Sequence, residues 1–424
     1  MKSDKKHITI FEHQVIRLDQ DYNGSTLDKN QLKTLQRFHG EKGLPYFSLI
    51  HNGVRFNEYV GIIQVGNTVI EVLPKADKVF PAASEKKQWR DMLIRMLLTV
   101  GVFDVHAPSA SSLNLKSNSI LDLYLELFIK ELEYLLHSGL VKQYRKKESN
   151  LPVLKGSLYF SKQIRHNLVH QERFYVCYTT YDLEHKIHMI LYKTIQLLMY
   201  INTNTALQSR IGALLLYFPE MPDLKIAPAS FDNIVFTRKT ESYKTAIHIA
   251  RLLLLHYHPD LVKGRNNVLA LMFDMNRLWE QFVKYSLRKH KSSNTTIIAQ
   301  NSKFFWRPDS GYRSKIRPDL VLNKDKDDCV VLDLKWKYLN GYNPSPDDLR
   351  QMYVYHEYYR AGKVALIYPG ASTSILIGRY LDPKTAKTIK KECAVISLAV
   401  EPAIKEWQKN IHDEIEKWRK IPLE

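Results

Sequence analysis

The chain has 424 residues, of which 45% are hydrophobic and 25% charged, a balance that is typical of globular proteins and excludes a fibrous or disordered one. Lys and Arg number 62 against 44 Asp and Glu, so the formal charge of +18 attracts polyanions, and nucleic acid is the leading candidate. An anionic membrane surface would explain the charge equally well. No apolar run approaches the roughly 18 residues that a spanning helix needs, so we expect no membrane partner.

The N-terminus and the cysteines bear on the compartment. Residues 1–7 lack the apolar core of a signal peptide, which predicts a cytoplasmic protein. The three cysteines, Cys177, Cys329 and Cys393, lie far apart and form no Cys-x-x-Cys pair. Neither a disulfide framework nor a zinc ribbon is therefore expected.

The patterns along the chain predict an α+β protein of three domains. Residues 1–84 carry short β-branched and aromatic segments, notably 60–65 and 68–73, and are expected to form a β-rich N-terminal domain. Helical periodicity then takes over, so residues 85–267 are expected to form a mainly helical middle domain, with a hairpin near 151–160.

The last part of the chain, residues 268–424, is expected to be a self-contained α/β core. Its elements are expected as a helix at 268–290, strands at 296–300, 318–323 and 329–337, a helix at 346–360 and a strand at 363–368. The second of these helices has an explicit start signal, with Ser345 as N-cap, Pro346 at the first helical position and Asp348 three residues after the cap.

Two carboxylates and a lysine fall on neighbouring predicted strands of this core. Asp319 belongs to the first strand, and Asp333 and Lys335 end the second, where alternation points both side chains to the same face. Phosphodiester hydrolysis needs an activated water and charge neutralisation, which a carboxylate-held Mg²⁺ and an adjacent basic group supply. We therefore expect a PD-(D/E)xK active site, with Asp319 and Asp333 as Mg²⁺ ligands and Lys335 as the catalytic lysine, which reaches the water that the metal orients.

The spacing alone is a weak signal. The same pattern of an acid two residues before a lysine also occurs at Asp4, Glu85, Glu184 and Asp382. The alternative for Asp333 and Lys335 is a surface charge pair on an edge strand. Their context argues against it, because they end an apolar run, follow a Pro-Asp on the preceding strand and precede a capped helix.

Three helical residues are placed to support such a site. Glu280 precedes the strands and is a candidate third metal ligand and catalytic carboxylate, although a solvated helix acid is the alternative. Gln351 and Tyr355 are four residues apart on the capped helix, so they share a face and could orient the lysine or a phosphate.

A basic segment with interleaved aromatic residues adjoins the site. Between Lys284 and Arg317 there are nine Lys or Arg and one acid, Asp309. The candidate DNA-binding residues are Lys303, Arg307, Arg313, Lys315 and Arg317, and the interleaved aromatic residues are Phe304, Phe305, Trp306 and Tyr312. Such a segment could follow a phosphate backbone and stack against bases, although a solvated face is the alternative.

Several motifs together resemble the McrC family, the nuclease partner of the AAA+ GTPase McrB in modified-cytosine restriction. They are Tyr59-Val60-Gly61, Ile70-Glu71-Val72-Leu73-Pro74-Lys75, Leu154-Lys155-Gly156-Ser157-Leu158, Leu278-Trp279-Glu280, Pro318-Asp319 and Asp333-Leu334-Lys335-Trp336-Lys337. The spacing of Gln351 and Tyr355 is also similar to a signature of RecB-type nucleases.

The resemblance implies a division of labour with a partner. It places catalysis on Asp319, Asp333 and Lys335, and docking onto a ring of McrB-like subunits on the N-terminal region, which would stimulate GTP hydrolysis. For that docking we expect a loop that presents Arg55 and Phe56. No Gly-x-x-x-x-Gly-Lys-[Ser/Thr] loop occurs in the chain, so GTP is expected on the partner, which also reads the methylated base.

Two other functions remain open from the sequence. One is a stand-alone PD-(D/E)xK nuclease of DNA repair or recombination, which should cut with Mg²⁺ alone. The other is a non-enzymatic DNA-binding assembly protein, for which the charge of +18 would suffice and the carboxylates would be incidental.

Overall fold

The computed structural model describes residues 6–22, 24–40, 43–66, 68–75, 84–100, 120–202, 204–258, 268–337, 339 and 343–422. The chain divides into two compact units, one made of Met1–Val102 with Met272–Glu424 and the other of Phe103–Leu271. The helices in the described part of the chain are all too short or too polar to cross a bilayer.

The N-terminal part of the first unit is β-rich, as expected. Its elements are β1 (Lys6–Phe11), β2 (Val15–Arg17), α1 (Lys29–His39), β3 (Phe47–Ile50), β4 (Gly53–Phe56), β5 (Tyr59–Val65), β6 (Thr68–Leu73) and α2 (Glu85–Thr99). Strand β6 lies between β1, which is parallel to it, and β5, which is antiparallel. The strands expected at 60–65 and 68–73 are therefore confirmed. All six residues of β6 are buried, including Glu71, whose carboxylate accepts from Arg90 of α2.

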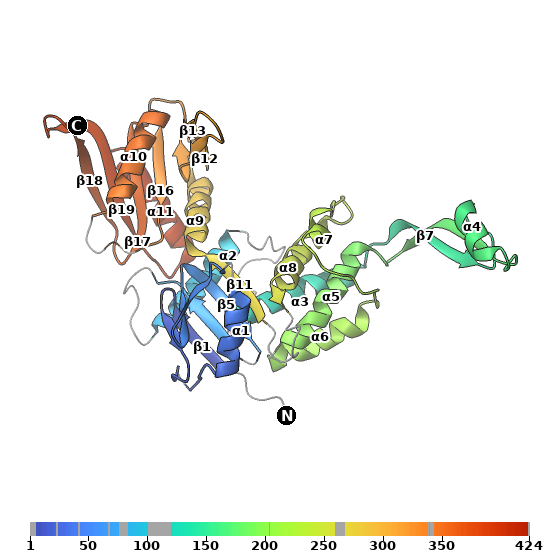
Figure 1. Ribbon diagram of the computed structural model, residues 1–424. Coiled ribbons are helices and arrows are strands. Elements are labelled where there is room, and N and C mark those ends of the chain that lie inside the picture. Colours follow the sequence, from blue (N-terminus) through green and yellow to red (C-terminus); the bar gives the residue numbers. More distant parts are fainter. Residues whose placement is uncertain are drawn as a thin grey trace. The chain divides into compact units, whose positions relative to one another are not determined.

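The C-terminal part of the first unit contains the sheet on which the predicted site lies (Figure 1). Its elements are β12 (Ile297–Ala299), β13 (Lys303–Trp306), β14 (Ser314–Ile316), β15 (Leu320–Leu322), β16 (Val330–Leu334), α10 (Pro346–Tyr359), β17 (Lys363–Gly370), β18 (Ser374–Leu381), β19 (Thr388–Ala399) and α11 (Ile404–Arg419). Six strands form one mixed sheet in the order β12-β15-β16-β17-β19-β18, with β15 and β16 antiparallel and β16, β17 and β19 parallel.

Helix α10 covers one face of this sheet and fixes the direction of the β16 side chains. Met352 and Tyr355 of α10 pack in one core with Val331 of β16 and Val364 of β17. Because strand side chains alternate, Asp333 lies on the same face as Val331, toward α10. The helix begins as expected, since the Ser345 side chain caps it by accepting from the Asp348 N–H.

The helix expected at 268–290 was wrong over its first seven residues. Residues Val268–Asp274 form strand β11, and the helix, α9, is Met275–His290. Asp274 ends the strand and caps the helix, because its carboxylate accepts from the Arg277 N–H at 3.2 Å. An apolar run such as Val-Leu-Ala-Leu-Met-Phe fits a buried strand as well as a buried helix, and here burial in a sheet decided.

The second unit is mainly helical, with a β-sheet arm. Its elements are α3 (Ile120–Ser138), β7 (Gln143–Leu151), β8 (Ser157–Leu158), α4 (Phe160–Asn167), β9 (Phe174–Asp182), α5 (Lys186–Ile201), α6 (Thr205–Tyr217), α7 (Ala229–Asp232), the 3₁₀ helix η1 (Glu241–Tyr243), α8 (Lys244–Leu255) and β10 (Tyr257–His258). Strands β7, β9 and β8 form an antiparallel sheet that extends from the helices and ends at α4, and this segment, residues 143–182, is called the arm below (Figure 1).

The compact units group the chain differently from the three domains expected from the sequence. Segments 1–84 and 268–424 fall almost wholly in the first unit. A hydrogen bond of 2.8 Å joins them, from the Trp336 indole N–H to a carboxylate oxygen of Glu12. Contacts of this kind argue against independent folding of the first and last segments.

Candidate active site

Asp319 and Asp333 lie side by side at the ends of the antiparallel strands β15 and β16. Leu320 pairs with Leu332, so Asp319, one residue before β15, lies beside Asp333. The Asp319 carboxylate accepts from the backbone N–H of Leu334 at 2.7 Å, which fixes it across the strand pair. The hairpin arrangement expected from the sequence is confirmed at the level of the backbone.

Lys335 lies on the same face as Asp333. Its ammonium nitrogen is 2.8 Å from Asp333 Oδ2, and Asp333 is only 2% exposed. The backbone N–H of Lys335 donates to Ile367 O of β17 at 3.0 Å. The lysine is therefore fixed at both its backbone and its side chain, at the point where β16 ends.

The two carboxyl groups repel each other in a buried environment. Burial, and then the charges of Asp333 and Glu280, raise the pKa of Asp319 to about 8. Burial also raises the pKa of Asp333, against the opposing attraction of Lys335. Burial alone would lower the pKa of Lys335, but its neighbour Asp333 raises it, so the lysine stays charged.

The carboxylate pair fits a hard divalent cation. Mg²⁺ is commonly held by one or two carboxylates and completes its shell with water and phosphate oxygens. A cation between Asp319 and Asp333 would relieve the repulsion that raises the pKa of Asp319. Within the described residues, no group of three or more His, Cys, Asp or Glu side chains is placed to hold a metal ion, so a third ligand stays a prediction.

Glu280 lies on α9 and faces the same charges. Burial, with the negative charges of Asp333 and Asp274, raises the pKa of its carboxyl, and Arg317 opposes that rise. The side-chain amide of Gln300 donates to Glu280 Oε2 at 3.4 Å. The structure thus places Glu280 near the pair electrostatically, and its role as a ligand stays a prediction.

Gln351 reaches the site from α10. Its side-chain amide nitrogen is 3.4 Å from Asp333 Oδ1 and 2.7 Å from the hydroxyl oxygen of Tyr355. The predicted common face of Gln351 and Tyr355 is confirmed. Their contact is with the carboxylate Asp333, whereas the sequence suggested the lysine or a phosphate as their target.

The sequence did not point to Asp348 and Lys337 as parts of this charge network. The Lys337 ammonium lies 2.6 Å from Asp348 Oδ2, and that of Lys335 lies 3.8 Å from Asp348 Oδ1. Burial would raise the pKa of Asp348, but Lys337 and Ser345 hold it below its usual value. Asp348 reaches the lysines only because α10 packs on the sheet. The one feature of the sequence that marked Asp348 was its place in the first turn of the capped helix.

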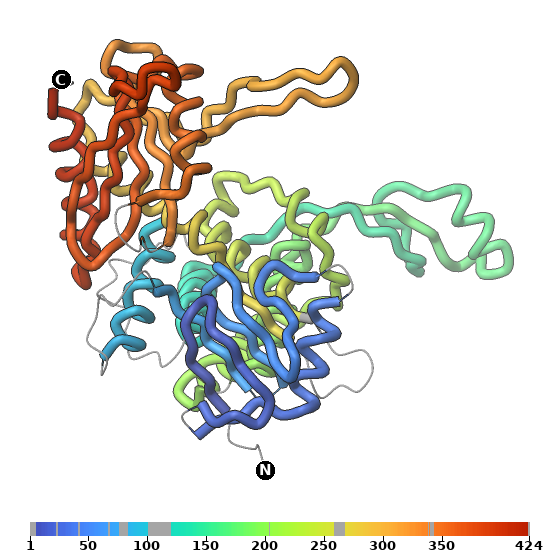
Figure 2. Tube along the Cα trace, turned by 60° about the vertical axis from the view of Figure 1, so that its left-hand side comes forward, coloured from blue at the N-terminus to red at the C-terminus, as the bar shows by residue number. Residues whose placement is uncertain are grey.

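The basic segment forms an antiparallel hairpin of β13 and β14, residues 303–316, which is called the basic hairpin below. Figure 2 shows it in orange, extending away from the sheet. Its aromatic side chains are exposed, with Trp306 at 57% and Tyr312 at 98%. Arg313 and Lys315 lie over the ring of Phe304, at 5.2 and 4.9 Å from its centroid.

The five candidate DNA-binding residues do not all lie on the same part of the hairpin. Arg307 and Arg313 lie in the exposed loop between its strands, and Lys315 lies on β14. Lys303 instead turns back to α10, where its ammonium donates to Tyr358 O at 2.6 Å. Arg317 follows β14, and its positive charge opposes the rise in the pKa of Glu280.

The expected docking loop around Arg55 and Phe56 was wrong in one respect. Residues Gly53–Phe56 are strand β4, so alternate side chains point to opposite sides. Arg55 is exposed, whereas Phe56 is fully buried and packs against Phe47 at 5.9 Å between ring centroids. Phe56 is therefore a core residue, and Arg55 alone can face a partner.

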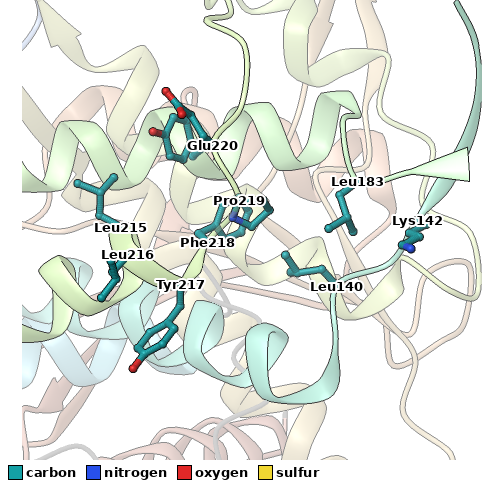
Figure 3. A pocket seen from close by; sticks show the side chains of 10 residues that line it. Leu140, Lys142, Leu183, Leu215, Leu216, Tyr217, Phe218, Pro219 and Glu220 are labelled. Atoms are coloured by element: carbon teal, nitrogen blue, oxygen red, sulfur yellow. The ribbon is translucent and has the colours of Figure 1, made fainter. Parts of the chain in front are cut away.

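A cavity of about 810 Å³ lies in the second unit (Figure 3). It is lined mainly by apolar side chains that follow α3 and end α6, including Leu140, Leu215 and Phe218. Of its lining residues, Glu220 is the only acid and Lys142 the only base. Its lining has no carboxylate pair, unlike the site on the six-stranded sheet.

Fold and site together define the class of this protein: a mixed α+β chain whose six-stranded sheet carries a carboxylate pair, with Asp333 buried and Asp319 half-buried, and a lysine at adjacent strand ends. Residues 54–369 match the family described as McrBC 5-methylcytosine restriction system component, which is more than half of the chain. The chain belongs to this family, and the resemblance to McrC is confirmed.

Two solved structures have a similar fold. One is the refined half-complex from the tetradecameric assembly of Thermococcus gammatolerans McrB AAA+ hexamers with bound McrC, where the match is 21% identical, has a TM-score of 0.72, and covers 97% of this chain and 100% of that one. The other is the cryo-EM structure of the Thermococcus gammatolerans McrBC complex, at 22% identity and a TM-score of 0.50, with 67% and 88% covered. No curated protein matches the chain.

Proposed function

We propose that the chain is the DNA endonuclease subunit of a modification-dependent restriction system of the 5-methylcytosine type, with a Mg²⁺-dependent PD-(D/E)xK site. One observation carries the proposal. Asp319 and Asp333 meet at adjacent strand ends, and the ammonium of Lys335 lies 2.8 Å from Asp333 Oδ2. Membership of a restriction-system family supports the same conclusion.

The geometry assigns a task to each side chain. Mg²⁺ bound to Asp319 and Asp333 would neutralise charge on the phosphate and lower the pKa of a bound water. Lys335 places a positive charge beside Asp333, where it can stabilise a phosphate oxygen. Gln351 donates to Asp333 Oδ1 and keeps that carboxylate oriented.

Double-stranded DNA is the proposed substrate, and the basic hairpin is its proposed contact. Arg307, Arg313 and Lys315 lie in or beside the exposed loop, and Arg317 lies between the hairpin and Asp319. Cationic side chains of this kind bind phosphates without reading sequence, while exposed aromatic rings stack on or wedge between bases. The hairpin would thus hold the duplex next to the carboxylate pair.

A GTP-hydrolysing McrB-like AAA+ ring is the proposed partner. The sequence lacks a phosphate-binding loop, and the solved complexes with a similar fold contain McrB and McrC. Two described surfaces suit docking: β4 with the exposed Arg55, and the arm, where Phe160 is 71% and Val169 84% exposed. Exposed apolar side chains that cluster on a surface mark protein contacts.

The test is cleavage of methylated and unmethylated DNA by the purified chain with Mg²⁺, alone and with the GTPase and GTP. We expect cleavage of methylated DNA that requires all components. Cleavage with Mg²⁺ alone would instead identify a stand-alone nuclease. Binding without any metal-dependent cleavage would identify a non-enzymatic assembly protein.

The docking surfaces are tested by GTPase stimulation. Substitution Arg55→Ala in β4, and Phe160→Asp with Val169→Asp in the arm, should each lower stimulation if its surface docks. All three positions are exposed, so the fold should tolerate the changes. If both variants stimulate fully, the partner docks elsewhere.

A further inference from the structure

Trp336, the residue directly after Lys335, is held more firmly than its neighbours. It is 5% exposed, and its backbone N–H donates to the Asn276 side chain of α9 at 3.0 Å. Its indole N–H donates to Glu12 Oε1 at 2.8 Å. Its ring packs edge-on against the fully buried Trp89 and Trp279, at 6.3 and 5.6 Å between centroids.

Glu12 is itself fixed at the ends of two strands of the N-terminal sheet. It follows β1 directly and is 6% exposed, and its backbone N–H donates to Leu73 O of β6 at 2.9 Å. The carboxylate oxygen that accepts from Trp336 also accepts from the Lys75 N–H, at 2.7 Å. With these three hydrogen bonds, one from its backbone and two to its side chain, Glu12 cannot move without disturbing the edge of that sheet.

Trp336 and Lys335 transmit this constraint to the site because they are consecutive. Adjacent residues on an extended strand point to opposite faces, so fixing the indole on one face fixes the lysine on the other. Lys335 has no regular strand beyond it, since β16 ends at Leu334. The Lys335 N–H donates to Ile367 O, and beyond that bond the backbone that carries the lysine is held through Trp336.

We infer that Glu12 and Trp336 are positioning residues for the catalytic lysine, so that the N-terminal sheet is part of the nuclease machinery. The inference rests on the proposed function. Loss of the Glu12–Trp336 hydrogen bond would free the end of β16 and let the Lys335 ammonium leave Asp333. Misplacement of a reacting group by about 1 Å can cost about a hundredfold in rate.

The experiment compares Trp336→Phe, which removes the N–H and keeps an aromatic ring, with wild type in Mg²⁺-dependent cleavage. Rates are normalised to the folded fraction from thermal unfolding. We expect kcat to fall at least about tenfold, while the KM for DNA stays unchanged. The matched control is Trp418→Phe in α11, where the indole is also fully buried but has no acceptor within the described residues.

Substitutions of Glu12 provide the second part of the experiment. Glu12→Gln keeps a carbonyl acceptor for both N–H groups and should retain the wild-type kcat, whereas Glu12→Leu should lose as much as Trp336→Phe. The double variant Glu12→Leu with Trp336→Phe should lose no more than either alone, because both remove the same bond.

Two failures are distinguishable. Absence of metal-dependent cleavage by the wild-type chain would overturn the proposed function and the positioning role with it. If the wild type cuts, a normal kcat in Trp336→Phe, an equal loss in Trp418→Phe, or additive losses in the double variant would overturn the inference alone.

Discussion

Lys335 lies between two carboxylates, 2.8 Å from Asp333 Oδ2 and 3.8 Å from Asp348 Oδ1. We expect Lys335→Ala to lower the cleavage rate by about 10²–10³-fold, because it removes the positive charge that would stabilise the attacked phosphate. DNA affinity should change little. Single-turnover cleavage and a binding titration measure the two effects separately.

Lys384→Ala is the matched control, since Lys384 shows the same acid-x-lysine pattern on the exposed turn between β18 and β19. Its rate should equal that of the wild type. A Lys335 variant that cuts at the wild-type rate would remove this residue from the mechanism.

The raised pKa of Asp319 predicts that the stability of the metal-free protein depends on pH. Burial, and then the charge of Asp333, raise its pKa from 3.8 to about 8. The unfolded chain releases this proton near pH 4, whereas the folded chain keeps it, so the contribution of Asp319 to stability is full below pH 3.8 and is lost as pH rises through 8. We therefore expect Asp319→Asn to raise the melting temperature in EDTA more at pH 8 than at pH 5.

Magnesium provides the complementary measurement. Added Mg²⁺ should raise the melting temperature of the wild type at pH 8, because binding to the folded state stabilises it. It should raise that of Asp319→Asn much less. A gain from Asp319→Asn that is the same at both pH values would contradict the assignment of the shifted pKa to this carboxyl.

At the scale of elements, removal of positive charge tests whether the basic hairpin binds DNA. Replacement of Arg313, Lys315 and Arg317 by Ala should weaken DNA binding and flatten its dependence on salt by up to about three counterions, with little loss of sequence preference. The affinity measured from 50 to 300 mM salt gives the slope.

A control with the same loss of charge is available in the turn between β18 and β19 and at the start of β19. Lys384, Lys387 and Lys390 are exposed there. Their replacement lowers the net charge equally and should leave the slope nearly unchanged. Equal slopes for both triple variants would remove the basic hairpin from the DNA interface.

The order of elements around the site could be predicted because each has a local cause. Alternation predicted strands where β15 and β16 lie, and the cap at Ser345 predicted the start of α10. The first seven residues of the helix expected at 268–290 were wrong because an apolar run does not distinguish a buried strand from a helix. The prediction that Phe56 faces a partner was wrong because Phe56 lies on the side of β4 that packs in the core.

Contacts between elements could not be predicted, since they depend on how the chain packs. Asp348 reaches Lys337 only because α10 lies on the sheet, and nothing local joins Glu12 to Trp336, which are 324 residues apart. The two candidate carboxylates could be proposed from a motif. The groups that hold the motif in place could not.

For the whole molecule, the link between Glu12 and Trp336 predicts the effect of a deletion. A chain without residues 1–84 loses β1, β5, β6 and the acceptor of the Trp336 N–H, and exposes apolar surface of α2. We expect it to lose cooperative unfolding of the first unit and all cleavage, although the carboxylates and the lysine remain. Near-ultraviolet circular dichroism and a thermal melt measure this.

The full-length Glu12→Leu variant is the control for that deletion, because it removes the same acceptor and keeps the N-terminal sheet. It should unfold cooperatively and lose only cleavage. A chain starting at Glu85 that melts cooperatively and still cuts DNA would show that the nuclease needs neither the N-terminal sheet nor the Glu12–Trp336 link.

The division of the first unit between the two ends of the chain has a consequence during synthesis. Glu12, Trp89 and β6 leave the ribosome well before Trp336, which lies 324 residues after Glu12. In that interval the buried faces of β6 and α2 lack part of their cover, while Phe103–Leu271, being continuous in sequence, can already fold. Newly made chains should therefore need protection from association until translation is nearly complete, and a nonsense mutation before Trp336 should yield aggregated protein.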